Sequence, residues 1–158
     1  MTHFKAVALD VDGVLTDGTF TWGLGGEEFK SFSFRDVMGI SLARKAGIEF
    51  ALISGEASPL VDRFAQKLGI FAVYKGCKDK GAALQAFAES MGLLADDICF
   101  VGDDVNDLPA FALAGWSAAP ADAHPRAKEV VDFVAQACGG RGAVREILDH
   151  LMNEQIQP

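Results

Sequence analysis

The sequence predicts an α/β fold built on a doubly wound, mainly parallel β-sheet of the Rossmann-like type. Short apolar runs of strand type alternate with segments of helical periodicity along the 158 residues, and this alternation produces a parallel sheet with helices on both faces. Several apolar runs end abruptly in polar residues, the pattern of a site at the carboxyl edge of such a sheet. Half of the residues are hydrophobic, so we expect one globular domain over 1–158.

The first expected strand is Ala6–Leu9, a short apolar run that stops at Asp10. The segment 18–32 then alternates apolar and polar residues on either side of the glycine-rich turn 23–26, which predicts a β-hairpin flap. Its aromatic residues are too apolar for a hairpin exposed to water. The hairpin must therefore pack on this domain or on another subunit, and the second arrangement is favoured. These aromatic residues are Phe20, Trp22, Phe29 and Phe32.

The remaining elements alternate regularly, and local signals mark their ends. Ser58 and Pro59 suit the N-cap and first position of a helix, and Gly69 suits the residue that ends it. The other expected strands are 48–53, 71–74, 98–101, 116–119 and a short sixth segment, 133–134. The expected helices are 35–46, 58–68, 81–91, 105–114, 125–131 and 142–153.

Bulk composition excludes several classes of function. The net charge of −8 argues against nucleic-acid and anionic-membrane partners. The sequence contains no run of 18 uncharged apolar residues and starts without a signal-peptide pattern, so we expect neither a membrane span nor export. Its three cysteines form no CxxC pair, which is typical of reduced thiols in the cytoplasm. The three histidines share no zinc-ligand spacing.

Two acids, Asp10 and Asp12, follow the first expected strand. Residues two apart in an extended chain face the same side, and Gly13 allows the chain to turn just beyond them. Two carboxylates about 4–5 Å apart repel each other by a few kcal/mol at an effective dielectric of about 20. The pair therefore suits a divalent cation with a preference for oxygen ligands, such as Mg²⁺. A solvated turn with two acids is the other interpretation of this motif on its own.

Other expected strands are also followed by polar residues. Ser54 follows the second strand, Lys80 lies just past the third, and a group of acids follows the fourth. The carboxyl ends of parallel strands meet at one edge of the sheet, so these side chains can converge. Each has an ordinary alternative by itself, as a turn residue, a solvated lysine or an N-cap. The acids of the fourth group are Asp103, Asp104 and Asp107.

This combination of residue types fits phosphoryl transfer. Asp10 would attack phosphorus and form an aspartyl-phosphate, while Asp12 would act first as general acid and then as general base. Ser54 and Lys80 would hold the phosphate oxygens. Asp103 would bind Mg²⁺ together with Asp10 and the backbone carbonyl of Asp12.

Four segments together resemble the motifs of the haloacid dehalogenase superfamily. They are DVDGVLTDG at 10–18, Ser54-Gly55, Lys80, and GDDVNDLP at 102–109. The hairpin, Arg35-Asp36, APADAH at 119–124 and GGRGAVRE at 139–146 further resemble the small capless phosphatases of 2-keto-3-deoxy sugar acid phosphates. This second likeness covers nearly the whole chain.

The resemblance implies a Mg²⁺-dependent phosphatase without a cap domain. Its substrate would be 3-deoxy-D-manno-octulosonate 8-phosphate or keto-deoxy-nonulosonate 9-phosphate. It also implies a homotetramer, in which the flap 18–32 and the C-terminal tail 139–158 of a neighbour cover each site. Gly55 would join Ser54 and Lys80 at the phosphate, and Asp104, Asn106 and Asp107 would support the site.

Two positions depart from the pattern of the eight-carbon enzymes. They usually have Gly-Arg-x-Ser where this chain has Gly55-Glu56-Ala57-Ser58, so the local charge is reversed. Val37 stands where the family usually has glycine, which would alter the floor of the sugar pocket. Glu56 and Lys67 resemble the nine-carbon enzymes instead, although Lys67 also fits a solvated helix face. The expected substrate residues are Glu56, Arg63, Lys67 and, from a neighbour, Arg141.

Two alternatives come from other functional classes. A non-catalytic tetramerisation domain of the same fold would have lost a motif residue, and none is lost here. A receiver domain phosphorylated on aspartate would keep a long-lived aspartyl-phosphate and would not turn over phosphate esters. The acid at position 12, placed for general acid–base chemistry, argues against the receiver domain.

Overall fold

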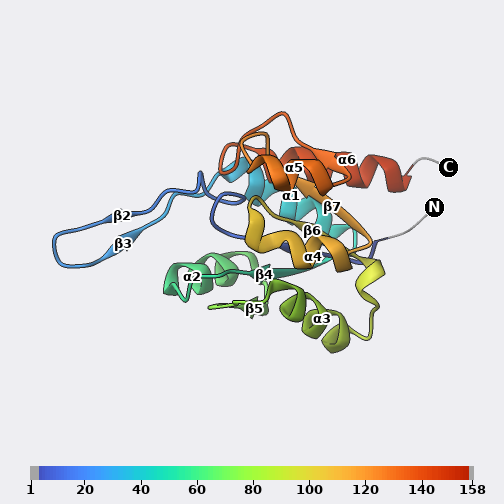
Figure 1. The fold of residues 1–158 in the computed structure, drawn as a ribbon, viewed down its shortest axis with the longest axis horizontal. Helices are drawn as coiled ribbons and strands as arrows, with labels where there is room; N and C mark the ends of the chain where they lie inside the picture. Colours follow the sequence, from blue (N-terminus) through green and yellow to red (C-terminus); the bar gives the residue numbers. More distant parts are fainter. Residues whose placement is uncertain (1–3, 157–158) are drawn as a thin grey trace.

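The computed structural model describes residues 4–156 and has a layered α/β arrangement (Figure 1). Six strands form one parallel sheet in the order β5-β4-β1-β6-β7-β8. The predicted fold class is therefore confirmed. The strands are β1 (Ala6–Leu9), β4 (Glu49–Ile53), β5 (Ala72–Tyr74), β6 (Ile98–Val101), β7 (Trp116–Ala119) and β8 (Phe133–Val134).

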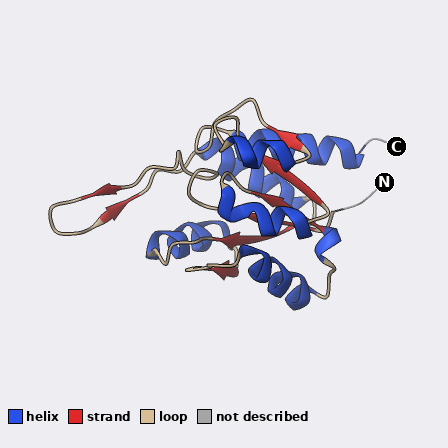
Figure 2. Cartoon of the chain, in the orientation of Figure 1, coloured by secondary structure: helices blue, strands red, loops and turns tan. Residues whose placement is uncertain are grey.

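Helices cover both faces of this sheet (Figures 1 and 2). Side chains alternate along β1, so Val7 and Leu9 belong to one core cluster while Ala6 and Ala8 belong to the other. The first cluster includes residues of α1, α2 and α6, and the second includes residues of α3, α4 and α5. The helices are α1 (Phe34–Lys45), α2 (Pro59–Leu68), α3 (Lys80–Met91), α4 (Leu108–Leu113), α5 (Pro125–Val130) and α6 (Ala143–Ile156).

The strand order reverses beside β1. From β1 the chain moves outward to β4 and β5, then crosses back to β6 on the other side of β1. The register places Leu9, the last residue of β1, next to Leu52 of β4 and Val101 of β6. The loops that follow these three strands therefore emerge side by side, at the position where doubly wound sheets bind ligands.

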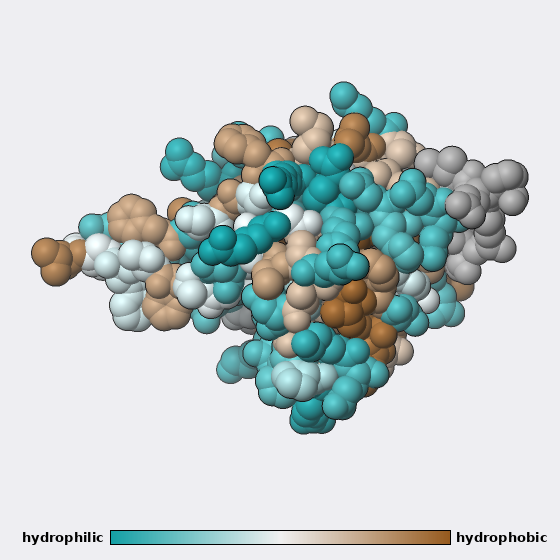
Figure 3. Space-filling model, turned by 90° about the horizontal axis from the view of Figure 1, so that it is seen from above, coloured by the Kyte–Doolittle hydropathy of each residue, from teal (hydrophilic) through white to brown (hydrophobic). Residues whose placement is uncertain are grey.

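The predicted hairpin is confirmed, with two short strands, β2 (Thr21–Trp22) and β3 (Glu28–Phe29). It projects from the body of the molecule and carries apolar surface along its length (Figures 1 and 3). The side chain of Trp22 is 70% exposed and that of Leu24 is fully exposed. Of the four predicted aromatic residues of this flap, Phe32 stacks on Phe64 of α2 with ring centres 4.1 Å apart, whereas the other three are more than half exposed.

One local prediction was wrong, and one short element was missed. The segment 105–114 is not one helix, because a 3₁₀ turn at Val105–Asp107 precedes α4. The Asp107 carboxylate accepts hydrogen bonds from the backbone N–H groups of Asp103 and Asp104, which tightens this turn. A second 3₁₀ turn, Ala95–Asp97, was not predicted.

The ends of the predicted domain and tail, residues 1–3 and 157–158, lie outside the described residues. Within the part of the chain that the structure describes, none of the helices is both long enough and apolar enough to span a bilayer.

Candidate active site

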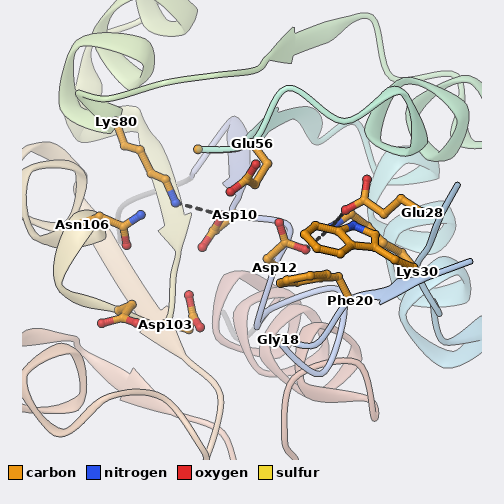
Figure 4. Close-up of a pocket in the computed structure, with 13 residues that line it drawn as sticks. Asp10, Asp12, Gly18, Phe20, Glu28, Lys30, Glu56, Lys80, Asp103 and Asn106 are labelled. Carbon is orange, nitrogen blue, oxygen red and sulfur yellow. Dashed lines mark hydrogen bonds and ion pairs between the residues drawn. The ribbon is translucent and has the colours of Figure 1, made fainter. Parts of the chain in front are cut away.

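A cavity of about 360 Å³ opens where the chain leaves β1 and β6 (Figure 4). Polar residues from the loops after β1, β4 and β6, from the start of α3 and from the hairpin line it, together with aromatic residues of the hairpin. The sequence-predicted residues among them are Asp10, Asp12, Gly55, Glu56, Lys80, Asp103, Asp104 and Asn106. Gly18, Phe20, Trp22, Glu28 and Lys30 complete the lining. Most residues predicted from the carboxyl ends of the strands therefore meet at one place.

Lys80 is the central cation of this cluster. Its side chain is 2% exposed, and its Nζ lies 2.9 Å from Asp10 Oδ1 and 2.7 Å from Asp107 Oδ1. Lys80 is the first residue of α3, whose N-cap is Asp79, so the helix start directs the ammonium under the end of β1. Asp107 is fully buried behind it. Lys80 thus holds the carboxylate of Asp10, the predicted nucleophile, in place.

Three carboxylates crowd this end of the sheet. Asp10, Asp103 and Asp107 offer oxygen atoms that all lie within 4.8 Å of one another. Gly13 allows the Asp103 carboxylate to lie against the loop after β1, because a Cβ at this position would lie 1.8 Å from Asp103 Oδ2. Gly13 also has φ +84°, a backbone conformation that favours glycine. The glycine after the Asp-x-Asp motif is thus required by packing as well as by the turn.

The crowding shifts the pKa values of these carboxyls upward. Burial and then the charge of Asp107 raise the pKa of Asp10 well above its usual range, although Lys80 opposes the change. Burial, with further repulsion from Asp107, raises the pKa of Asp103 to about 6. Burial lowers the pKa of Lys80, but Asp10 and Asp107 outweigh it and the net shift is upward. A single lysine does not offset three acids.

The donor set fits a divalent cation. Asp107 uses one oxygen for Lys80 and the other for two backbone N–H groups, so Asp10 and Asp103 are the carboxylates that can bind a metal. Carboxylate oxygens in excess of nearby positive charge are the ligands that Mg²⁺ prefers. A bound cation would also reverse the upward pKa shifts of both carboxyls. The predicted metal residues Asp10 and Asp103 therefore lie together.

Asp12 lies on the other side of Asp10 from Lys80 (Figure 4). Its Oδ1 accepts a hydrogen bond of 2.6 Å from the Nζ of Lys30, which follows β3 of the flap. Lys30 Nζ also lies 3.4 Å from Glu28 Oε1. Burial lowers the pKa of Lys30, whereas Asp12 and Glu28 raise it, with a net upward shift. The two acids of the Asp-x-Asp motif thus have different lysine partners.

Ser54 ends up behind the cavity wall. It follows β4, is fully buried, and its hydroxyl accepts a hydrogen bond of 3.2 Å from the Glu56 N–H. Gly55 and Glu56, the next two residues, line the cavity. The turn after β4 therefore reaches the cavity that Asp10 lines, with Ser54 set deeper than its neighbours.

Two predicted substrate residues line a neighbouring cavity instead. Arg63 and Lys67 project from α2 into a space of about 490 Å³, whose wall also includes Lys30, Phe32, Leu60 and Phe64. Lys30 belongs to both cavities, so they adjoin at the base of the flap. Lys67 also lies 5.6 Å from the ring centre of Phe34. Arg141 lines neither of these two cavities. Its charge helps to lower the pKa of Asp17, although hydrogen bonds from Thr19 contribute more to this shift.

The two C-terminal motifs support the catalytic loops through backbone contacts. The N–H of His124 donates to the carbonyl oxygen of Asp103 at 2.7 Å. Gly139 is packed against the loop after β1, because a Cβ there would lie 2.0 Å from the carbonyl oxygen of Gly13. Gly140 donates to the carbonyl oxygen of Val14. The predicted break at residues 139–140 is therefore a packing contact with the loop after β1.

The flap supplies site residues that the sequence reasoning missed. Phe20 and Trp22 form an aromatic wall with ring centres 4.9 Å apart. Glu28 and Lys30 lie two apart on a predicted strand, so the alternation placed them on the face opposite Phe29. That alternation was the available signal. It did not indicate that this face turns toward Asp12.

Comparison with known proteins identifies the family. The family model for haloacid dehalogenase-like hydrolases matches residues 34–115, just over half of the chain. The chain belongs to the haloacid dehalogenase-like hydrolase family. Two curated relatives are the 3-deoxy-D-manno-octulosonate 8-phosphate phosphatases of Salmonella typhi and Haemophilus influenzae. The first is 40% identical over 97% of this chain and 81% of the relative, and the second is 41% identical over 98% and 86%.

Solved structures of this hydrolase family superpose closely on the chain. The cobalt-bound phosphatase of Haemophilus influenzae has a TM-score of 0.94 and 41% identity, covering 98% of this chain and 90% of that one. The Moraxella catarrhalis phosphatase, in complex with magnesium, phosphate and a KDO molecule, has a TM-score of 0.93 and 34% identity, covering 96% and 87%. The sequence-based recognition of the family is therefore confirmed.

Proposed function

We propose that the chain is a Mg²⁺-dependent phosphomonoesterase that hydrolyses a 2-keto-3-deoxy sugar acid phosphate. The observation that carries this proposal is the convergence of Asp10, Lys80 and Asp103 at one edge of the sheet. Lys80 lies 2.9 Å from Asp10, and carboxylate oxygens of Asp10 and Asp103 lie within 4.8 Å. An anion-holding lysine, a nucleophile and a metal-binding acid are the parts that phosphoryl transfer requires.

The reaction would proceed in two displacements. Asp10 attacks phosphorus, a bond forms between its carboxylate oxygen and phosphorus, and the bond from phosphorus to the sugar oxygen breaks. Asp12 gives its proton to the departing sugar oxygen. Asp12 then takes a proton from water as that water attacks the aspartyl-phosphate, which releases inorganic phosphate and restores Asp10.

The remaining residues hold the phosphate and the charge. Lys80, the Ser54 hydroxyl and the N–H of Gly55 would bind phosphate oxygens as negative charge moves through the transition state. Mg²⁺, when bound by Asp10, Asp103 and the backbone carbonyl of Asp12, offsets the charge of the carboxylates and the phosphate. Asn106 and Asp104 line the same cavity, and Asp107 keeps Lys80 in place. We assign a supporting role to each of these three residues.

The charge distribution favours one orientation of the sugar acid. Glu56 lines the catalytic cavity and would repel the substrate carboxylate. Arg63 and Lys67 in the adjoining cavity supply the positive charge that a carboxylate needs. We therefore propose that the phosphate lies at Asp10 and the carboxylate at Arg63 and Lys67, with the sugar chain passing Lys30.

The names of the relatives favour 3-deoxy-D-manno-octulosonate 8-phosphate as the substrate. Glu56, which the eight-carbon enzymes usually replace with arginine, favours keto-deoxy-nonulosonate 9-phosphate as the second candidate. Phosphate release from both compounds ranks them by kcat/KM. Variants of Arg63 and Lys67 should mainly raise KM for the true substrate, because they contact its remote end, whereas variants of Glu56 test whether this acid sets the preference between the two compounds.

The decisive variant is Asp10→Asn. We expect it to lower kcat by more than about 10³-fold, because an amide is not a nucleophile toward phosphorus. Asp62→Asn is the matched control, since Asp62 lies on the exposed face of α2 and pairs with Lys75. Phosphate release by both variants is measured with saturating Mg²⁺. Turnover by Asp10→Asn comparable with that of the control would contradict the mechanism.

We also propose that the chain acts as a single domain over 1–158 within a homotetramer. The exposed apolar flap supports this, since it needs a covering partner. Arg141 would then reach the site of a neighbour. A cytoplasmic location is supported by the three free cysteines, Cys77, Cys99 and Cys138.

A further inference from the structure

Lys30 is a buried cation on an otherwise exposed flap. Its side chain is only 2% exposed, while nearby flap residues such as Trp22 and Phe29 are more than half exposed. A buried ammonium is unfavourable unless it is paired. Here it is paired twice, with Asp12 at 2.6 Å and Glu28 at 3.4 Å. The flap is therefore tied to the catalytic loop at this point.

The pairing continues to a third element. Glu28 Oε2 accepts a hydrogen bond of 2.8 Å from the hydroxyl of Ser58. Ser58 is the N-cap of α2 and is 6% exposed. The side chains of Asp12, Lys30, Glu28 and Ser58 thus form one chain of contacts from the loop after β1, through the flap, to the start of α2.

We propose that Lys30 is a positioning residue that fixes the carboxylate of Asp12 for its two proton transfers. This inference rests on the proposed function. The hydrogen bond engages Oδ1 of Asp12, and a proton transfer needs one carboxylate oxygen, which Oδ2 supplies. Lys30 itself neither gains nor loses a proton. Glu28, which is held by Ser58, keeps the ammonium beside Asp12.

The geometry favours this role over direct binding of the substrate. Two carboxylates already balance the charge of Lys30, so its ammonium has less attraction for another anion than Arg63 or Lys67. A residue that contacts the substrate alone would change KM, whereas one that orients Asp12 changes the chemical steps. The two roles therefore give different kinetics.

The test uses the Mg²⁺-loaded enzyme with Lys30→Met and Lys30→Arg. For the sugar acid phosphate, we expect Lys30→Met to lower kcat by about 10²-fold with KM changed less than about threefold, since misplacing a general acid forfeits much of its effect. Lys30→Arg should restore most of the activity, because a guanidinium can donate to both acids.

A second substrate separates the two displacements. 4-Nitrophenyl phosphate has a leaving group that departs without a proton, so phosphorylation of Asp10 should stay fast in Lys30→Met. Hydrolysis of the aspartyl-phosphate still needs Asp12 as base and should become slow. We expect a burst of nitrophenolate of about one equivalent per site, followed by slow turnover. A purely structural defect would lower the burst amplitude together with the rate.

Asp12→Asn should give the same burst, and adding Lys30→Met to it should cause less than about threefold further loss, because both act through one group. Lys75→Met is the matched control, since Lys75 pairs with Asp62 outside both cavities and should keep full activity. If Lys30→Met is unfolded by circular dichroism, Glu28→Gln replaces it, with a smaller loss of kcat and the same burst expected.

Three results would overturn the proposal. They are retained kcat with a raised KM, multiplying losses in the double variant, and a folded Lys30→Met or Glu28→Gln that shows no burst. Failure of the proposed function gives other signatures. If the parent enzyme hydrolyses the aryl ester but not the sugar acid phosphates, the assigned substrate class is wrong while the burst still tests Lys30. Activity of Asp10→Asn would reject the aspartyl-phosphate and the positioning role with it.

Discussion

Asp10 and Asp103 occupy a place where negative charge exceeds positive charge. Both carboxyls lie near Asp107, and Lys80 offsets part of the repulsion. Without a metal ion, burial and repulsion raise the pKa of Asp103 to about 6 and that of Asp10 well above its ordinary value. Protons and Mg²⁺ therefore compete for the same oxygens.

This competition predicts a pH-dependent effect of the metal on stability. A carboxyl whose pKa is raised by folding stabilises the metal-free protein at low pH, and that contribution is lost as pH rises through the raised pKa. Mg²⁺ should replace it above about pH 6. We expect 10 mM Mg²⁺ (roughly a saturating excess, by mass action) to raise Tm by several degrees at pH 7.5 and by less than about 1 °C at pH 5.

Thermal unfolding with and without Mg²⁺ across this range measures the effect. Asp103→Asn is the informative variant, since loss of this ligand should abolish most of the Tm increase at every pH. An increase in Tm of equal size at pH 5 and pH 7.5 would contradict the competition.

At the scale of elements, α1 and α6 are joined through a buried acid. Asp36 of α1 is 1% exposed, and its Oδ1 accepts a hydrogen bond from the N–H of Arg145 in α6. Its Oδ2 has no hydrogen-bond partner among the described residues. Burial raises the pKa of Asp36, and the backbone N–H groups at the start of α6 oppose this shift. The carboxyl thus caps a helix that is distant in sequence. The cost of burying its charge opposes the stability that the cap provides.

We predict opposite outcomes for two variants of this residue. Asp36→Asn keeps the acceptor oxygen and removes the buried charge, so its stability relative to the parent should increase as pH rises from about 4, the ordinary pKa of an aspartate, through the raised pKa of Asp36. Asp36→Ala leaves a helix N–H unpaired and should lose about 1–3 kcal/mol. Urea unfolding at several pH values measures both. Asp149→Asn, which removes the half-exposed partner of Arg145, serves as control and should change stability by less than about 0.5 kcal/mol. Equal losses in Asp36→Asn and Asp36→Ala would contradict this account.

The elements that the sequence predicts well are those with local causes. β1 and β6 are unbroken apolar runs, and α2 has its N-cap at Ser58 and a left-handed glycine, Gly69, at its end. The convergence of Asp10 and Lys80 follows from topology, because both lie at carboxyl ends of parallel strands or just beyond them. Such features need no knowledge of side-chain packing.

Features that depend on how distant segments meet were not predictable in this way. The bond between Lys30 and Asp12 exists because the base of the flap, at Lys30, lies beside the loop after β1. The acids after β6 have different partners, since Asp107 is buried against Lys80. This arrangement depends on the 3₁₀ turn before α4. Ser54 was correctly placed after β4, but its depth behind Glu56 depends on the turn geometry.

At the scale of the whole molecule, the flap is the feature that a lone chain leaves unexplained. Its side chains of Phe20, Trp22, Leu24 and Phe29 are at least 55% exposed, and Figure 3 shows this apolar surface on the part that projects farthest from the body. Contiguous apolar surface of this kind marks an interface. Phe20 and Trp22 also line the catalytic cavity, so covering the flap would also order one wall of the site.

We therefore predict that assembly and activity fail together when the flap is made polar. The parent chain should sediment at about four times its 16.8 kDa mass, and Trp22→Ser combined with Leu24→Ser should shift it toward the monomer with at least about a tenfold loss of kcat/KM. Analytical ultracentrifugation and phosphate release measure the two effects. Phe71→Ser is the matched control, because Phe71 is 96% exposed beside β5, outside the flap and the catalytic cavity, and should leave both unchanged. A monomeric parent enzyme with full activity would contradict the prediction, since its cavity would then be complete within one chain.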